Sequence, residues 1–211
     1  MNITELNTVT GGLSKPSKMP GLAYGTPASA CGIGSILRAA GKHTVCGSCY
    51  AHKGMYSFPV VKAAQARRLE SISSPSWTGW MTELIGKKLR KATGPDRVFR
   101  WHDSGDIRDA EHLSKIAKIA KNLPTVDFWL PTKEYKIVRK WLDENKRPKN
   151  LTIRVSGAII GAVTPAIPGT VSSTVASGTG YACPAYTQGG KCGDCRACWN
   201  NSVKNIDYPK H

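Results

Sequence analysis

Four cysteines in the last part of the chain have the spacing of iron-sulfur ligands. Cys192, Cys195 and Cys198 follow one another at intervals of three in CGDCRACW, and Cys183 precedes them and is followed by Pro184. A C-x2-C-x2-C loop can present three thiolates to three corners of a 4Fe-4S cubane, and a remote cysteine followed by proline commonly supplies the fourth. This four-cysteine group predicts a 4Fe-4S cluster, with structural zinc as the less favoured metal.

A second group, the three-cysteine group, consists of Cys31, Cys46 and Cys49. Three thiolates leave one iron of a cubane without a protein thiolate, so that iron could bind water, a substrate, or a side chain such as His43 or His52. Two alternatives stay open. The group could form a structural zinc site with three cysteines and one histidine, or cysteines from both groups could share one cluster.

The composition of the sequence indicates the cellular compartment of the protein and its possible binding partners. No secretory signal and no membrane-spanning apolar run is apparent, so we expect a protein of the cytoplasm without a membrane partner, where seven cysteines would stay reduced. The net charge of +16 makes a nucleic-acid partner as credible as a solvated basic surface. A basic stripe is expected along one helix, formed by Lys115, Lys118 and Lys121.

Hydrophobic patterns predict an α/β fold with a parallel β-α-β-α-β core in a single domain, residues 1–211. Buried strands are expected at 98–102, 126–130 and 151–156, with helices at 109–123 and 134–145 between them. Such crossovers imply either a doubly wound sheet or a partial or reduced β/α barrel. Further helices are expected at 59–72 and 77–94, and one more strand at 170–176. We divide the domain into an extended N-terminal arm (1–30), a Cys-rich loop (31–58), the α/β core (59–160) and a loop-rich C-terminal segment (161–211), with cluster-binding loops at both ends.

Polar residues follow each of the three core strands, in WHDSGD, LPTKE and IRVSG. The carboxyl ends of parallel strands meet at one edge of a sheet, where ligands commonly bind. Each residue also has a purely structural explanation, such as a helix cap, a turn or an ion pair. Three such strand ends together predict a shared site for a small-molecule cofactor, which we call the polar edge: His102, Asp103, Ser104, Asp106, Thr132, Lys133, Arg154 and Ser156. The candidates for catalysis among them are His102, Asp103, Asp106, Lys133 and Arg154.

Several motifs together resemble the phage-encoded gene product 88 family. They are CGSCYAHKGMYSFPVVKAAQARR, FRWHDSGD, FWLPTKE, PKNLTIRVSG and CPAYTQGGKCGDCRACW, which span Cys31 to Trp199. The resemblance implies a viral origin and the cytoplasm of the host cell. There is a looser likeness to another phage family and, through it, to radical-SAM enzymes, in which a cluster-binding three-cysteine loop is followed by the β/α units of a partial barrel.

The looser likeness implies a role for each group. The three-cysteine group would hold a cluster whose free iron binds S-adenosylmethionine, the four-cysteine group would hold an auxiliary cluster, and HDSGD would contact the methionine part of the cofactor. The expected function is therefore a phage-type 4Fe-4S protein, with radical-SAM-like enzyme activity as one form of it. The alternative is a cluster-stabilised nucleic-acid-binding or electron-transfer protein without catalysis.

Overall fold

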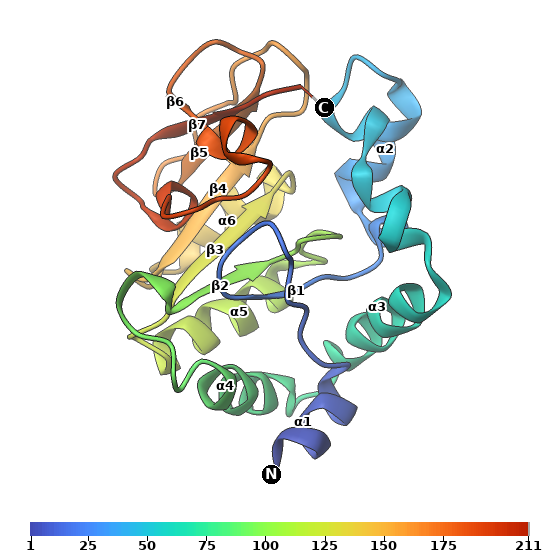
Figure 1. Cartoon of the computed structure of the whole chain (residues 1–211), viewed down its shortest axis with the longest axis vertical. Coiled ribbons are helices and arrows are strands. Elements are labelled where there is room, and N and C mark those ends of the chain that lie inside the picture. The colour runs from blue at the N-terminus through green and yellow to red at the C-terminus, as the bar shows by residue number, and fades with distance from the viewer. Residues whose placement is uncertain (211) are drawn as a thin grey trace.

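A seven-stranded parallel sheet forms the centre of the computed structural model, which describes residues 1–210 (Figure 1). Its strands are β1 (Leu22–Tyr24), β2 (Val98–Trp101), β3 (Asp127–Thr132), β4 (Leu151–Ser156), β5 (Val171–Val175), β6 (Tyr181–Ala182) and β7 (Asn205–Tyr208). Their order across the sheet is β1-β2-β3-β4-β5-β7-β6, and every neighbouring pair is parallel. The predicted α/β class and parallel core are thereby confirmed. Strands β1 to β5 lie side by side in the order in which they occur in the sequence, as in a β/α barrel. The sheet is nevertheless open, with β1 and β6 at its edges.

Six α-helices accompany the sheet within residues 1–210. They are α1 (Ile3–Thr10), α2 (Gly32–Ala40), α3 (Pro59–Ser71), α4 (Trp77–Lys88), α5 (Ala110–Asn122) and α6 (Tyr135–Glu144). The sequence predicted α3, α4, α5 and α6, although α4 ends at Lys88, where the chain turns toward β2 instead of continuing to residue 94. Pro59 occupies the first turn of α3, and the Asp109 side chain caps α5 by accepting a hydrogen bond from the His112 amide. Within residues 1–210, no helix has the length and apolar character needed to cross a bilayer.

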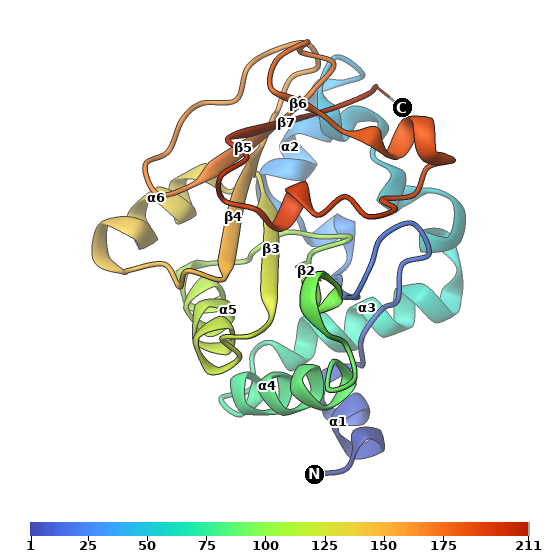
Figure 2. The same cartoon turned by 60° about the vertical axis from the view of Figure 1, so that its left-hand side comes forward.

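The two faces of the sheet are covered by different segments of the chain. Residues 99 and 101 of β2 and residues 151, 153 and 155 of β4 face the main core, which also contains buried side chains of α4, α5 and α6. Alternate residues such as Val98 and Trp129 face the other way and pack against Ala197, Cys198 and Trp199. Figures 1 and 2 show these helices on one side of the sheet and the red C-terminal segment on the other. The four-cysteine group therefore lies on the face that the helices leave free.

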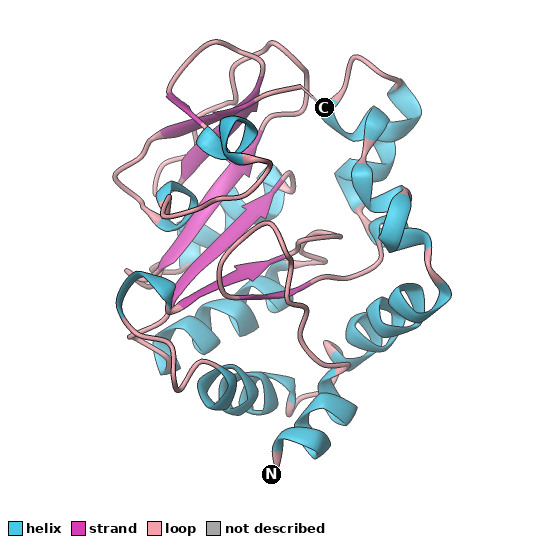
Figure 3. Cartoon of the chain, viewed as in Figure 1, coloured by secondary structure: helices cyan, strands magenta, loops and turns pink. Residues whose placement is uncertain are grey.

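The first thirty residues are not the extended arm that the sequence predicted. Asn2 and Glu5 form a reciprocal capping box, in which each side chain accepts a hydrogen bond from the other's amide at 2.9 Å, and this starts α1. The apolar segment Leu22–Tyr24 pairs with β2 as the edge strand β1. The Cys-rich loop likewise contains α2 and short 3-10 turns, and the C-terminal segment contains β6 and β7 besides the predicted β5 (Figure 3).

Candidate metal centres

The four cysteines near the C-terminus lie together against the face of the sheet. Cys198 is buried in a cluster with Val98 and Trp129, and Cys183 and Cys195 pack against that cluster. Burial raises the pKa of Cys192, and the neighbouring Cys183 and Cys195 raise it further. Cys192 is therefore within electrostatic reach of Cys183 and Cys195, and Cys198 is within reach of Cys183.

Arg154 on β4 holds this segment in place. It is completely buried, and its guanidinium donates hydrogen bonds to the carbonyls of Ser172, Ala197, Asn200 and Val203. Two further anchors are hydrogen bonds from Thr152 Oγ1 to the Trp199 carbonyl at 2.6 Å and from Trp199 Nε1 to the Phe99 carbonyl at 2.9 Å. Arg154 thus reaches toward the four-cysteine group, and the structure does not bring its guanidinium to the rest of the polar edge.

A second arginine, Arg100 on β2, lies between the two cysteine groups. Its guanidinium is 4.4 Å from the centre of the Trp129 ring and donates to the hydroxyl of Tyr50, the residue after Cys49, at 3.3 Å. Burial raises the pKa of Cys198 to about 11, against the lowering effects of its hydrogen bond with Tyr208 and of the charges on Arg154 and Arg100. None of the ion pairs within residues 1–210 joins Arg100 or Arg154 to a carboxylate. Two cations therefore lie beside Cys198 without a carboxylate at ion-pair distance, although the charge of Asp103 acts on Arg100.

The three-cysteine group lies at the carboxyl edge of the sheet, beside the polar edge. A methyl group placed on Gly34 would be 3.4 Å from the Cys31 sulfur and 3.8 Å from the Cys46 sulfur, so both sulfurs border the space left by this glycine. Burial raises the pKa of Cys31 to about 12, with further contributions from Asp106, Cys46 and Cys49, against a lowering by Lys133. The structure thus brings the three cysteines together with two residues of the polar edge.

Loops from three neighbouring strands hold the three-cysteine segment. After β3, Glu134 Oε1 accepts a hydrogen bond from the Ile33 amide at 2.8 Å, in the first turn of α2 directly after Cys31. After β2, the Asp103 carbonyl accepts from the Tyr50 hydroxyl at 2.6 Å. After β4, the Ala158 carbonyl accepts from the Val45 amide at 2.9 Å. The segment therefore covers the ends of the three central strands. Glu134 was noted in the sequence only as the end of LPTKE, and nothing there could identify its contact with α2.

Within the polar edge, Asp106 ties two strand ends together. Its carboxylate accepts hydrogen bonds from the amides of Ile107 at 2.8 Å and Lys133 at 2.9 Å. Burial raises its pKa to about 6, although the hydrogen bond from the Lys133 amide lowers it. Thr132 Oγ1 accepts from the Glu134 amide at 3.0 Å, as expected for a turn, and the Ser156 carbonyl accepts from the Tyr135 hydroxyl.

Three consecutive residues of the polar edge have polar atoms without partners. Both ring nitrogens of His102, Asp103 Oδ1 and Ser104 Oγ are buried and make no hydrogen bond within residues 1–210. His102 also has a φ of 56°, a left-handed conformation that is strained for a residue other than glycine. Its ring lies 5.4 Å from that of His112 on α5, so His102 faces the helical core. Unpaired buried polar atoms combined with backbone strain are typical of functional sites.

His43 and His52, the histidines considered as fourth ligands, differ in their exposure and contacts. His52 Nδ1 accepts a hydrogen bond from Arg38 at 2.9 Å, whereas His43 is exposed. Among residues 1–210, no group of three or more His, Cys, Asp and Glu side chains is arranged to hold a metal ion. The thiols of each group interact electrostatically without surrounding a single ion.

The comparisons with known proteins give one match. A family model described as Gene product 88 matches residues 4–176, which include the three-cysteine group, the polar edge and the sheet as far as β5. No curated protein and no solved structure matches the chain. The match begins before Cys31, where the motifs noted in the sequence start, and ends before Cys183, so the four-cysteine group lies outside it.

Proposed function

The chain belongs to the Gene product 88 family, as the sequence motifs indicated, and we propose that it is a phage iron-sulfur protein. In this proposal the four-cysteine group binds one 4Fe-4S cluster with all its irons ligated. The three-cysteine group binds a second cluster that has one open iron. The observation that carries the proposal is the pair of arginines beside the four thiols.

A buried cation is costly unless an opposite charge or a full set of hydrogen bonds compensates it. Arg154 is completely buried, and its partners are backbone carbonyls rather than carboxylates. Arg100 has a buried Nε without a hydrogen bond. With four neutral thiols, Arg154 would have carbonyl partners alone, and Arg100 would have only the charge of Asp103, which lies beyond ion-pair distance. A metal centre with four thiolates carries net negative charge, and this charge would balance the two arginines.

The spacing of the thiols favours a cubane over zinc. Zinc ligation requires each sulfur to be about 2.3 Å from a single ion. A cubane is larger, because inorganic sulfides separate its irons and each thiolate binds a different iron. The C-x2-C-x2-C loop, with the remote Cys183 followed by Pro184, fits the larger group. In the three-cysteine group, the missing side chain of Gly34 allows the backbone to approach Cys31 and Cys46 closely.

The open iron would face the polar edge, and this arrangement supports a radical-SAM-like activity. A reduced cluster there would supply an electron to a ligand bound at its open iron. S-adenosylmethionine offers an amine and a carboxylate for such an iron. Lys133, whose charge acts on Cys31 and Cys46, could pair with the carboxylate, and Asp103 Oδ1 and Ser104 Oγ are polar atoms still without partners.

The test is anaerobic purification followed by iron and sulfide analysis and electron paramagnetic resonance. We expect brown protein with two clusters per chain, and a spectrum of the reduced protein that changes when S-adenosylmethionine is added. The Cys195→Ala variant should lose the iron of one cluster and keep the response to S-adenosylmethionine, whereas Cys46→Ala should lose that response. Colourless protein that contains zinc and no sulfide would contradict the proposal.

A second candidate is a cluster-stabilised protein that binds nucleic acid or transfers electrons without catalysis. Exposed cations without ion pairs in residues 1–210 favour it, namely Lys118, Lys121, Lys136, Arg139 and Lys140 on α5 and α6. Lys115 does not extend this surface, because it pairs with Glu111 at 2.9 Å and donates to the Ile72 carbonyl at 2.8 Å. Two full clusters with no response to S-adenosylmethionine would favour this second candidate.

A further inference from the structure

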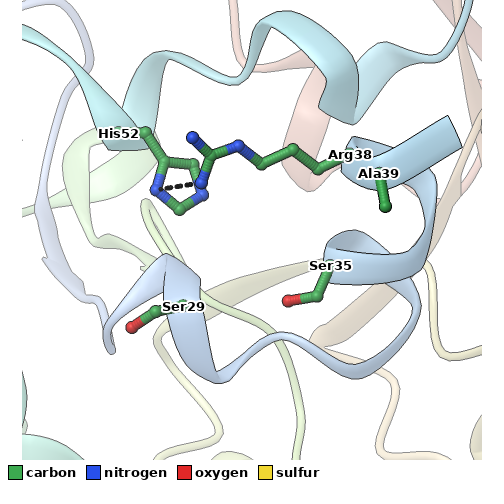
Figure 4. Close-up of a pocket in the computed structure, with 5 residues that line it drawn as sticks. All are labelled: Ser29, Ser35, Arg38, Ala39 and His52. Carbon is green, nitrogen blue, oxygen red and sulfur yellow. Dashed lines mark hydrogen bonds between the residues drawn. The ribbon is translucent and has the colours of Figure 1, made fainter. Parts of the chain in front are cut away.

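Two adjoining hollows lie on the outer surface of the segment that carries the three-cysteine group. One has a volume of about 450 Å³ and is lined by Ser29, Ser35, Arg38, Ala39 and His52 (Figure 4). The other, of about 430 Å³, is lined by Pro27, Ala28, Ser29, Ala51, His52, Tyr56, Ser57, Lys62 and Gln65. Ser29 and His52 line both, so the hollows form one continuous groove. No cysteine lines either hollow, so the groove is separate from the candidate metal centres.

The groove presents hydrogen-bond donors and positive charge. Ser35 and Arg38 lie one turn apart on α2, and Lys62 and Gln65 lie one turn apart on α3, so each pair shares a helix face. No Asp or Glu is among the lining residues. Neither Arg38 nor Lys62 takes part in an ion pair within residues 1–210. Both cations are therefore available to an anion.

His52 adds a donor to the groove. Arg38 Nη1 donates to His52 Nδ1 at 2.9 Å, and Figure 4 shows the two side chains pointing toward each other. Because a guanidinium can only donate, His52 Nδ1 must accept and carries no proton in this pair. A neutral ring that accepts at Nδ1 carries its proton on Nε2 and donates from there.

Gln65 provides an independent indication of a ligand. The residue is only 4% exposed, yet it lines the groove, makes no side-chain hydrogen bond within residues 1–210 and has no polar atom among the enclosed ones that lack a partner. Its amide therefore opens into the groove, where a ligand could hydrogen-bond to it. The ring of Tyr56 also lines the groove and gives it an aromatic surface.

We propose that this groove binds the phosphate groups of a nucleotide, either free or within a single strand of nucleic acid. Arg and Lys are the residues that pair with phosphate oxygens, and serine hydroxyls and a neutral histidine donate to them as well. Tyr56 is placed to contact a base. The inference does not depend on the iron-sulfur proposal, because the groove contains none of the thiols.

The test measures binding to anaerobically purified full-length protein with three probes: pyrophosphate, ATP without magnesium, and a labelled single strand of about ten nucleotides. Arg38→Gln and Lys62→Gln should each weaken binding about tenfold or more, as expected for the loss of a charged hydrogen bond. Arg90→Gln is the matched control, because Arg90 is exposed beyond the end of α4 and lines neither hollow. Circular dichroism should show that each variant is folded.

The outcomes separate the two sources of phosphate. Binding of ATP without binding of the strand identifies a free nucleotide, and binding of the strand alone identifies nucleic acid. Either result supports the site if it is sensitive to Arg38→Gln and Lys62→Gln. The inference is overturned if none of the probes binds, or if Arg90→Gln weakens binding as much as the groove variants, because diffuse charge would then account for the effect.

Discussion

At the scale of single residues, Gly34 and Arg154 determine the packing and the charge around the thiols. Gly34 leaves space beside two sulfurs of the three-cysteine group, where any side chain would collide with Cys31. Arg154 ties the four-cysteine segment to the sheet and brings a buried charge next to its thiols. Neither role can be inferred from the residue type alone.

Gly34→Ala should impair the three-cysteine group. The added methyl group would lie 2.9 Å from Cys31 Cβ, closer than such atoms approach in folded proteins, so the cysteine must move. We expect loss of the signal that responds to S-adenosylmethionine, with the other cluster retained. Gly79→Ala is the matched control, because nothing lies within 4 Å of its added methyl group on α4, and it should stabilise the protein by about 0.4–1 kcal/mol. Retention of both clusters in Gly34→Ala would show that this space is not needed.

Arg154→Met should destabilise the fold around the four-cysteine group and lower the midpoint potential of its cluster. The substitution removes the donor from four carbonyls and should lower the free energy of unfolding by about 2 kcal/mol. It also removes a positive charge beside the cluster, which should make reduction harder and lower the midpoint potential in a redox titration. Exposed Arg139→Met should change neither quantity, with a stability effect within about 0.5 kcal/mol. An unchanged potential in Arg154→Met would separate this arginine from the metal centre.

At the scale of elements, the candidate site depends on how loops join the first segment to the sheet. Glu134, at the start of α6, accepts the amide of Ile33 in the first turn of α2. A carboxylate at a helix N-terminus satisfies an amide that has no partner in the helix and interacts favourably with the helix dipole. One side chain therefore links the helix after Cys31 to the end of β3.

Glu134→Ala should loosen the three-cysteine segment while leaving the sheet intact. Loss of such a cap costs about 1 kcal/mol of stability. We expect faster alkylation of Cys31 by a thiol reagent in the metal-free protein, measured by mass spectrometry of the labelled peptides. Glu70→Ala is the control, because Glu70 is exposed on α3 and makes no ion pair within residues 1–210. Equal alkylation rates in both variants would contradict the role given to Glu134.

Elements that form because of a pattern in their own residues could be predicted, whereas elements that form through contacts with distant parts of the chain could not. The strands and helices of residues 98–156 have regular apolar periods, and the structure confirms all five. The helix α1 starts at a capping box, Asn2 with Glu5, that the sequence contains but that Gly, Ser and Thr downstream obscured. The strands β1, β6 and β7 are short and form because the sheet offers them an edge. Such long-range causes leave no local pattern.

The same distinction applies to the candidate site. Sequence spacing singled out both groups of cysteines, whose role as cluster ligands stays a prediction, and the structure shows Asp106 and Lys133 acting on Cys31. The position of Arg154 could not be foreseen, because alternate residues of a strand point to opposite faces. Only the packing of residues 197–203 shows which face its guanidinium reaches.

At the scale of the whole molecule, the parallel sheet separates two environments. Helices and an aromatic core occupy one face, and the four-cysteine segment occupies the other. Arg100 reaches from this second face to Tyr50, next to Cys49, so its guanidinium links the regions of both cysteine groups. On the helical side, the buried rings of His102 and His112 lie 5.4 Å apart where β2 ends against α5.

This buried histidine pair should make the stability of the fold depend on pH. Burial, with the charges of Arg108 and Lys115, lowers the pKa of His112 to about 3, and burial, with His112 and Arg100, lowers that of His102 as well. Below the ordinary pKa of about 6.5, the unfolded chain binds protons that the folded one cannot, so stability is complete above pH 6.5 and is lost as the pH falls toward 3. Denaturant titrations at pH 7.5 and 5.5 should show this loss, and His112→Leu should reduce the difference by about 1 kcal/mol. His43→Leu should leave it unchanged because His43 is exposed. If His112→Leu keeps the full pH dependence, other groups are responsible for it.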